Sequence, residues 1–398
     1  MQLTMHRNAR RAGLGLAAAA ALLLGGGLAQ AADPLKIGVP TDLSSTYADL
    51  GNQVIRAVEF AVEEANAKGG IDGREVEYRS LDTEANPDNA RRQSEKLVRE
   101  GYPIILGLIA SGEGLAIAPM MERWGGLYIS TINKSDKLTG DSCQPRVFRV
   151  NTQSEMDALT IKPWLQERKE GKWAVVAVDI AWGRGSSEAF AKTAEGVGKT
   201  MTGQLFIPPG TNDFAPYIQQ VKDSGAEGIW VVLAGRDAIN FAQQAKQFGL
   251  TDTVTVAGQS FTTDNTVKAL GDVAKGIYGI INYSATLDTP ENQAFVAAWQ
   301  KKYGTDPTNF EGETYIGMQV LYQAVEKAGS TDPEKVAEAL SGGTFDTILG
   351  TLTLRAEDHQ LLTPNYFGVV EEYEGSLRPV ITMTATPEQV APPVTCEM

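Results

Sequence analysis

The sequence is short of the residues from which most metal sites and nucleophilic active sites are built. It has two cysteines, Cys143 and Cys396, and two histidines, of which only His359 lies beyond residue 31. A structural zinc site of cysteine and histidine needs four ligands, so this inventory excludes one. No G-x-S-x-G, H-E-x-x-H or paired-cysteine pattern occurs, and we expect no cofactor. His359 stands in the polar segment "RAEDHQLLTP", where we expect a surface histidine.

Positive charge and long apolar runs are also scarce. The 35 lysine and arginine residues are outnumbered by 49 aspartate and glutamate residues, which leaves a formal net charge of -14. An acidic chain is a poor partner for nucleic acid or for an anionic membrane surface. Beyond the N-terminal region, no run approaches the roughly 20 apolar residues of a transmembrane helix. We therefore expect no nucleic-acid partner and no direct insertion into a membrane.

The N-terminal residues have the pattern of an export signal. Basic residues between positions 6 and 11 precede the apolar run "AGLGLAAAAALLLGGGLA", and Ala29-Gln30-Ala31 supplies the small-x-small pattern of a cleavage site. A membrane anchor is the alternative, but the apolar run is short, rich in glycine and lacks a charged stop. We predict a signal peptide over residues 1–31 that is cleaved on export.

Export changes what two cysteines are expected to do, because compartments outside the cytoplasm are oxidising. Two cysteines there most simply form one disulfide, Cys143–Cys396. This bond would close a loop of roughly 250 residues and tie the C-terminal tail to the body, a constraint of about 5 kcal/mol in the chain-entropy model. Two free thiols are the alternative.

Strand and helix patterns alternate along the chain. Continuous apolar segments such as "LKIGVP", "PIILGLI", "WAVVAVD" and "GIWVVLA" predict buried strands. Amphipathic segments between strands predict helices at residues 52–68, 155–170 and 185–196, and Asn86 and Pro87 form an N-cap and a first helical position. The alternation predicts an α/β fold with parallel sheets that are covered on both faces.

The length of the chain predicts two lobes, because 398 residues exceed the size at which one core keeps growing. Helical patterns at 290–303, 311–328 and 333–340 follow the second set of strands, and β-like segments end the chain. The C-terminal third is too helical to complete the second lobe alone, so we expect it to return to the first. The expected lobes are residues 32–150 with 284–360 and residues 151–283 with 361–398, joined by several crossings.

Ligands of open α/β sheets bind beyond the carboxyl ends of the strands. The loops at those ends are "TDLSSTYADLG", "IASGEG", "TINKSD", "DIAWGRG", "AGRD" and "GQSFTTDN", which we expect around one cleft between the lobes. Lys134, in the third of these loops, is placed to meet an anion. Trp182 is expected in a tight turn that faces the cleft. This turn is not a dinucleotide fingerprint, because Glu188 stands at the third glycine position.

Beyond residue 31 the chain resembles, over nearly its whole length, the periplasmic solute-binding proteins of the branched-chain amino acid type. The resemblance implies the type I periplasmic binding fold, in which two Rossmann-like lobes with parallel sheets are joined by a multi-strand hinge. It also implies a protein that is not an enzyme and that serves an ABC transporter. The matching segments are "KIGVPTDLSSTYADLG", "AVEEANAKGGIDGREVEYRSLDTEANPDNARRQSEKLV", "IILGLIASGEGLAIAPMMERWGGLYIS", "DKLTG", "DIAWGRG", "DFAPYIQQVKDSGAEGIWVV", "QQAKQFGL", "GIYGIINYS" and "AFVAAWQKKYGTDPTNFEGETYIGMQVL".

The resemblance also implies positions for a ligand pocket. Ser111 matches a serine that hydrogen-bonds the ligand carboxylate, and Ile132–Ser135 matches a second carboxylate-binding loop. Trp182 takes the place of an aromatic residue from the second lobe. Asn133 and Ser135 belong to that second loop, and Phe310 and Leu50 fall near positions that usually supply apolar wall. Tyr47, Arg236 and Glu311 are weaker candidates, of which Glu311 could bind an ammonium group.

Two departures from the family pattern change the expected ligand. The acidic residue that holds a ligand's ammonium group in the family corresponds to about Ser260, and no acid follows until Asp264. Lys134 stands where the family usually has a small or hydroxyl residue. A pocket that loses an anionic side chain and gains a cationic one prefers a ligand with a net negative charge over a zwitterion. The placement of Cys143 and Cys396 is similar to that in members that bind aromatic carboxylates.

We therefore predict a small organic acid with an aromatic or branched apolar body as the ligand, with a branched-chain amino acid as the alternative. Lys134 and Ser111 would hold its carboxylate, and Trp182 and Phe310 would enclose the rest. Each residue also has a structural alternative: a solvated lysine at the rim, a serine that caps a helix, and aromatic residues of the core.

The expected mechanism is capture between two lobes in the periplasm. A ligand that contacts both lobes shifts an equilibrium from an open to a closed form. The closed form would then dock on the permease subunits of an ABC importer. One alternative is a sensor protein that presents its closed form to a membrane receptor kinase. A carboxylate-dependent hydrolase is another, although the sequence distinguishes no pair of carboxylates.

Overall fold

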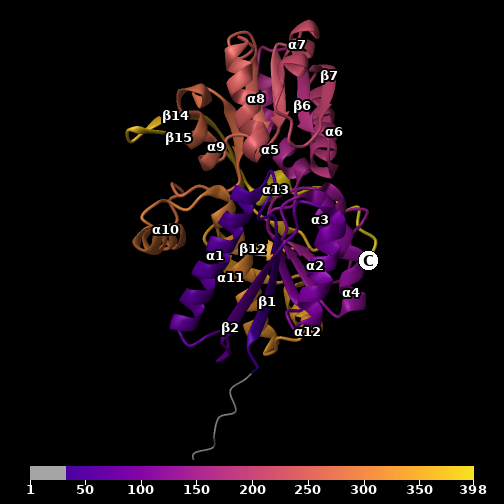
Figure 1. The fold of residues 1–398 in the computed structure, drawn as a ribbon, viewed down its shortest axis with the longest axis vertical. Helices are drawn as coiled ribbons and strands as arrows, with labels where there is room; N and C mark the ends of the chain where they lie inside the picture. Colours follow the sequence, from indigo (N-terminus) through magenta and orange to yellow (C-terminus); the bar gives the residue numbers. More distant parts are fainter. Residues whose placement is uncertain (1–32) are drawn as a thin grey trace, which may run out of the picture. The chain divides into compact units, whose positions relative to one another are not determined.

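The first of two large sheets in the computed structural model has five parallel strands (Figure 1). The structure describes residues 33–398, so the predicted signal peptide lies outside the described residues. In the order β2-β1-β3-β4-β5, the strands span Val76–Asp82, Leu35–Thr41, Ile104–Gly107, Leu127–Ser130 and Val147–Arg149. The central strands β3 and β4 are buried throughout, as continuous apolar segments predict. We call this sheet and the helices that cover it the first lobe.

Helices cover both faces of the first sheet. On one side α1 (Ala48–Ala67) packs against α11 (Asn309–Ala328), which packs against α12 (Pro333–Leu340). On the other side lie α2 (Pro87–Arg99), α3 (Ser111–Ile117) and α4 (Met121–Trp124). Asn86 caps α2 as predicted, with its side chain accepting a hydrogen bond from Asn89 N. A 3₁₀ turn, Ala118–Met120, separates α3 from α4, because Pro119 has no N–H to donate.

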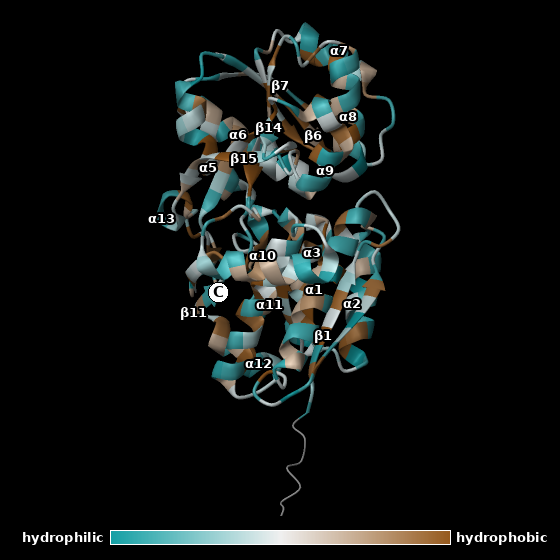
Figure 2. Cartoon of the chain, turned by 90° about the vertical axis from the view of Figure 1, so that its left-hand side faces the viewer, coloured by the Kyte–Doolittle hydropathy of each residue, from teal (hydrophilic) through white to brown (hydrophobic). Residues whose placement is uncertain are grey.

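The second large sheet has seven strands in the order β15-β14-β10-β9-β8-β6-β7. The strands β6 to β10 are parallel to one another, whereas β14 is antiparallel to β10 and β15 is antiparallel to β14. Figure 2 shows its apolar strands lying inside helices with hydrophilic outer faces. We call this sheet and its helices the second lobe. Its strands are β6 (Lys172–Val178), β7 (Thr200–Ile207), β8 (Gly228–Val232), β9 (Thr255–Gln259), β10 (Tyr278–Ile281), β14 (Asn365–Tyr373) and β15 (Ser376–Ala385), and its helices are α5 (Ser154–Glu167), α6 (Ala181–Gly196), α7 (Ala215–Asp223), α8 (Gly235–Gln247) and α9 (Asp264–Leu270).

The chain passes between the two lobes at three places, which we call the crossings. They are residues 150–153, between β5 and α5; residues 282–289, between β10 and α10 (Pro290–Tyr303); and residues 363–364, between β13 and β14. β13 (Leu361–Leu362) belongs to a small antiparallel sheet with β11 (Thr344–Thr347) and β12 (Gly350–Leu354). The predicted α/β class with two largely parallel sheets is confirmed, and the residue boundaries of the lobes stay a prediction.

Cys143 and Cys396 form a disulfide, as predicted, with their Cα atoms 5.7 Å apart. The tail that carries Cys396 follows β15 and the short helix α13 (Pro387–Val390), which packs against α5. Cys143 lies between β4 and β5 of the first lobe. The disulfide therefore connects a segment of the first lobe with the chain that leaves the second.

His359 is buried, and the prediction of a surface histidine is wrong. Its side chain is 6% exposed, its Nδ1 lies 3.1 Å from Val147 O, and its ring stacks on Phe148 with 4.0 Å between centroids. Burial lowers the pKa of His359 below its usual value. The neighbouring charges that suggested a surface site, Arg355 and Asp358, pair with each other.

Residues 33–398 contain neither a candidate membrane span nor a candidate metal site. None of the helices in this range is both long and apolar enough to cross a membrane. The same range contains no group of histidine, cysteine, aspartate and glutamate side chains arranged to hold a metal ion.

Candidate functional site

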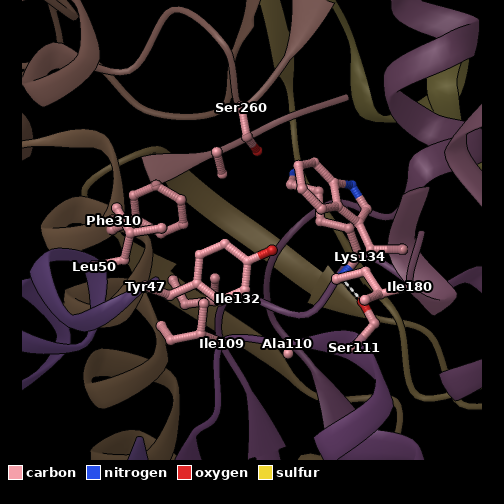
Figure 3. Close-up of a pocket in the computed structure, with 12 residues that line it drawn as sticks. Tyr47, Leu50, Ile109, Ala110, Ser111, Ile132, Lys134, Ile180, Ser260 and Phe310 are labelled. Carbon is pink, nitrogen blue, oxygen red and sulfur yellow. Dashed lines mark hydrogen bonds between the residues drawn. The ribbon is translucent and has the colours of Figure 1, made fainter. Parts of the chain in front are cut away.

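A pocket lies where the carboxyl ends of both large sheets meet (Figure 3). Its cavity volume is about 30 Å³, far below the roughly 300–1,000 Å³ of typical small-molecule sites. Its walls therefore lie close together. Each of the loops expected around one cleft contributes to it, and the lining residues are Tyr47, Leu50, Ile109, Ala110, Ser111, Ile132, Lys134, Ile180, Trp182, Ala234, Ser260 and Phe310.

Most of the lining is apolar, and both lobes contribute to it. Leu50 comes from the first turn of α1 and Phe310 from the first turn of α11, and they lie together on one side of the pocket (Figure 3). Ile180 lies on the opposite side, at the start of α6. Within the described chain, no aspartate or glutamate side chain lines this pocket. An apolar guest without a positive charge suits such walls.

Ser111 supplies the best-defined polar group of the pocket. Its Oγ accepts hydrogen bonds from two backbone N–H groups, Lys134 N at 3.2 Å, which Figure 3 shows, and Ser135 N at 3.1 Å. Both lone pairs of the hydroxyl oxygen are thereby used, and no acceptor for its hydrogen occurs among residues 33–398. The hydroxyl therefore has one hydrogen to donate, and the two bonds that it accepts polarise it further. Its role is not that of a helix cap, since α3 begins at Ser111 itself and Ala110 is the capping position.

Tyr47 supplies a second donor. Its hydroxyl is buried and has no hydrogen-bond partner within the described part of the chain, and Figure 3 shows the oxygen directed into the middle of the pocket. Burial, together with the carboxylates of Asp237, Asp42 and Glu113, raises the pKa of Tyr47 well above its usual value. The phenol therefore stays protonated and can donate to a ligand. Asp42 fixes the preceding loop by accepting from Tyr47 N at 2.9 Å.

Trp182 is held in place through its indole nitrogen. It lies in the first turn of α6, and its Nε1 donates to Gln259 Oε1 at 3.0 Å. Gln259 ends β9 and in turn donates to the carboxylate of Asp157 on α5. Ser260 follows with a φ of 55°, a left-handed conformation that is uncommon outside glycine. Backbone strain of this kind concentrates at functional sites.

Similarity to known proteins shows the family of the chain. Residues 34–375 match the family model described as periplasmic binding protein. The Leu/Ile/Val-binding protein homolog 7 of Brucella suis is 30% identical over 348 residues, which are 82% of this chain and 85% of the relative. The chain belongs to the periplasmic binding protein family. Its relatives among the Leu/Ile/Val-binding proteins show that this periplasmic binding protein is of the branched-chain amino acid type. Because members of the family are solute carriers, it is not an enzyme.

Other similarities extend over most of the chain. The leucine-, isoleucine-, valine-, threonine- and alanine-binding protein of Pseudomonas aeruginosa is 26% identical over 324 residues, 81% of this chain and 86% of that protein. An ABC transporter solute-binding protein from Rhodopseudomonas palustris, in complex with 3,4-dihydroxybenzoic acid, has a TM-score of 0.83 at 22% identity and covers 89% of this chain and 98% of its own. A leucine-binding protein from Thermotoga maritima has a TM-score of 0.80 at 21% identity. The similarity covers 89% of this chain and 99% of that protein. The two solved structures show the fold.

Lys134 lines the pocket of this periplasmic binding protein, but its ammonium group is bound elsewhere. Nζ forms an ion pair with Asp157 Oδ2 at 3.2 Å and donates to Thr152 Oγ1 at 2.6 Å and Asn282 Oδ1 at 2.9 Å. The side chain is 5% exposed, so the alternative of a solvated lysine at the rim is wrong. These bonds use the charge that was expected to hold a ligand carboxylate.

Several predicted site residues do not line the pocket. Asn133 donates from its amide to Leu108 O at 2.9 Å inside the first lobe, and Ser135 meets the site only through its backbone N–H. Arg236 is exposed and reaches Thr46 Oγ1 at 3.5 Å. Glu311 pairs with Arg56 and accepts a hydrogen bond from Thr308 N at 2.7 Å as part of a capping box, so it does not hold an ammonium group in the pocket.

The lining residues that the sequence did not single out are small or aliphatic: Ile109, Ala110, Ile180 and Ala234. Each directly follows an apolar strand or lies within a few residues of its end, where an apolar side chain looks like a continuation of the core. The signal that could have found them is position, because every one stands in a loop already assigned to the cleft.

Proposed function

We propose that this protein is the substrate-binding subunit of an ABC importer and that it captures a small carboxylate with an aromatic or branched apolar body. The observation that carries the proposal is the Ser111 hydroxyl, which accepts two backbone N–H groups and has its hydrogen left to donate. A carboxylate is the acceptor that such a donor binds most strongly. Leu50, Trp182 and Phe310 would enclose the apolar body.

The names of similar proteins support a carboxylate as the common feature of the ligand. The curated relatives are named for leucine, isoleucine and valine, and solved neighbours contain 3,4-dihydroxybenzoic acid or 4-hydroxybenzoate. All of these compounds carry a carboxylate, and they differ in whether an ammonium group accompanies it. The absence of an acidic lining residue within residues 33–398 favours the compounds without one.

The arrangement of the pocket supports capture by closure. Tyr47 and Ser111 come from the first lobe, and Trp182 and Ser260 come from the second. A ligand that binds both sets favours the closed form over the open one, because only the closed form offers all contacts. Delivery to permease subunits in the periplasm would follow from recognition of that closed form.

Titration calorimetry of the purified protein tests the ligand class. Benzoate, 4-hydroxybenzoate and 4-methylpentanoate are expected to bind, and Ser111→Ala is expected to weaken binding about 10- to 100-fold, since hydrogen bonds to charged groups contribute about 1.5–3 kcal/mol. The control is Ser94→Ala, which removes a buried hydroxyl from α2, outside the pocket, and should leave affinity unchanged. Unchanged affinity in Ser111→Ala, or no binding of any of these acids, would overturn the ligand class. Uptake of a labelled acid by vesicles that contain the cognate permease tests delivery.

A further inference from the structure

The ammonium group of Lys134 sits in a cage assembled from distant parts of the chain. Thr152 comes from the first crossing, Asp157 from α5, and Asn282 from the second crossing. Glu313 of α11 adds a second carboxylate, with its Oε1 4.0 Å from Nζ. The lysine side chain and both carboxylates are almost completely buried. A buried ammonium group with this set of oxygen atoms is fully satisfied.

The cage is built independently of the lysine. The carboxylate of Asp157 accepts hydrogen bonds from Thr152 Oγ1 at 2.9 Å, Asn282 Nδ2 at 3.1 Å and Asn365 Nδ2 at 2.8 Å, and also from Gln259 Nε2. Glu313 is oriented by Asn309, whose amide donates to Oε2 at 2.7 Å, and Oε1 has no hydrogen bond. These supports come from residues other than Lys134, so the cage should persist when the lysine side chain is removed.

The side chain of Lys134 runs from the ligand pocket to this cage. Its own backbone N–H donates to Ser111 Oγ, so the side chain begins beside the hydroxyl to which we assign the ligand carboxylate. It ends at Asp157, on the helix that follows the first crossing. Lys134 lines the pocket along this path. The lysine side chain therefore extends from the carboxylate position to an ammonium position.

We propose that Lys134 determines the selectivity of the site by occupying an ammonium cage that would otherwise be open to a ligand. The inference rests on the proposed capture of a carboxylate and narrows the ligand to acids that carry no amino group. An amino acid would bring a second ammonium group into a pocket that no acidic side chain among residues 33–398 lines and beside a cage that Lys134 already occupies. Burying that charge without a partner is strongly unfavourable.

The wild-type protein gives the first test, with ligand pairs that differ only in the amino group. These are 4-methylpentanoate against leucine and 3-phenylpropanoate against phenylalanine, measured by titration calorimetry. The acid without an amino group is expected to bind roughly 100-fold more tightly or better, the ratio that follows from one unpaired buried charge. Equal affinity, or tighter binding of the amino acid, overturns the proposal.

Lys134→Ala gives the second test, which requires no knowledge of the ligand. Propylammonium reproduces the removed atoms from Cγ to Nζ, so it should bind in the emptied cage and raise the thermal midpoint of the variant by several degrees. Propan-1-ol and sodium chloride are the neutral and ionic controls, and none of the three should shift the wild type. The double variant Lys134→Ala/Asp157→Asn lacks the main carboxylate and should lose the response.

The outcomes separate this inference from the proposed function. A propylammonium response together with no binding of any acid would support the cage and remove the carboxylate ligand. Acid binding without a response to propylammonium would keep the ligand and overturn the cage. If Lys134→Ala folds neither alone nor with propylammonium, the cage does not exist without the lysine, and the inference fails. If Lys134→Ala folds, the ratio of its affinity for 4-methylpentanoate to its affinity for leucine should be at least about tenfold smaller than in the wild type.

Discussion

At the scale of single residues, the environment of the pocket is set by carboxylates that lie behind it. Glu113 is the third residue of α3, two positions after Ser111, and its Oε2 accepts from Ala110 N at 2.9 Å. Its Oε1 is buried without a partner. Burial raises the pKa of Glu113 to about 7, outweighing the hydrogen bonds to Thr83 and Ala110, which lower it. Glu313, also buried, has its pKa raised to about 7 for the same main reason.

These raised pKa values make stability depend on pH in a defined direction. The folded protein binds a proton at Glu113 more tightly than the unfolded chain does, whose carboxyl titrates near 4.5. The stabilisation is complete below pH 4.5 and is lost as the pH rises toward 7. We expect Glu113→Gln, which can still accept from Ala110 N, to reduce the loss of unfolding free energy between pH 5 and pH 8 by an amount on the order of 3 kcal/mol.

Urea denaturation at both pH values measures this difference. Glu188→Gln, which changes an exposed carboxylate of α6, is the control and should follow the wild type. If Glu113→Gln shows the full pH dependence of the wild type, Glu113 does not carry its proton into the neutral range.

Residues of the site differ in how far the sequence alone could place them. Ser111 and Trp182 stand in segments that follow strands in the sequence and were expected as loops at the cleft, and both line the pocket. The partners of Lys134 could not be predicted, because Thr152, Asn282 and Glu313 are far apart in the sequence and meet only when the crossings come together. A charge in a polar loop looks solvated until such partners are known.

At the scale of elements, the first turn of α6 shows how closely the pocket wall is packed. Gly183 lies next to Trp182, and a Cβ atom there would be 1.8 Å from Val178 O at the end of β6. No side chain fits unless the helix moves away from the strand. The wall that carries Trp182 therefore depends on a glycine for its position.

Gly183→Ala is expected to reduce the free energy of unfolding by about 1–3 kcal/mol, the usual cost of overpacking. It should also weaken ligand binding, because the displaced turn carries Trp182. Gly196→Ala, at the other end of the same helix, is the matched control: nothing lies within 4 Å of its added Cβ, and it should stabilise the protein by about 0.5–1 kcal/mol. Equal effects of the two substitutions in chemical denaturation would contradict the packing argument.

Caps, prolines and glycines explain which helix boundaries could be predicted from the sequence. The helices Pro290–Tyr303 and Pro333–Leu340 were predicted with their observed bounds, because Thr289 and Asp332 cap them and a proline begins each. α6 begins four residues before the predicted position, and α1 likewise, because Gly183 and Gly51 in their first turns favour a loop. In the structure these glycines allow a close approach, and a Cβ at Gly51 would be 1.7 Å from Asp42 O.

At the scale of the whole molecule, buried polar groups gather where the chain crosses between the lobes. Arg149, at the end of β5, is fully buried and donates to Ser135 O at 2.6 Å, Gln153 Oε1 at 2.8 Å and Gln360 Oε1 at 2.8 Å. Its partners lie before the first crossing, at the last residue of that crossing and before the third crossing. The order of strands and helices predicted the two sheets, and the predicted export led to the predicted disulfide. The polar network around Arg149 could not be predicted, because it depends on residues near the first and third crossings lying side by side.

The disulfide Cys143–Cys396 turns most of the chain into a ring, with a sequence separation of 253 residues. A pulling force applied between residue 33 and Met398 would pass through the disulfide and not through the residues between the two cysteines. Only the segment before Cys143 and the residues after Cys396 could then be extended. The hidden contour length is about 900 Å, at roughly 3.5 Å per residue. Optical-tweezers traces recorded before and after reduction should differ by that length, whereas equal lengths would mean that the bond does not form. The second lobe is thereby shielded from mechanical extension, although no part of it is covalently cross-linked within itself.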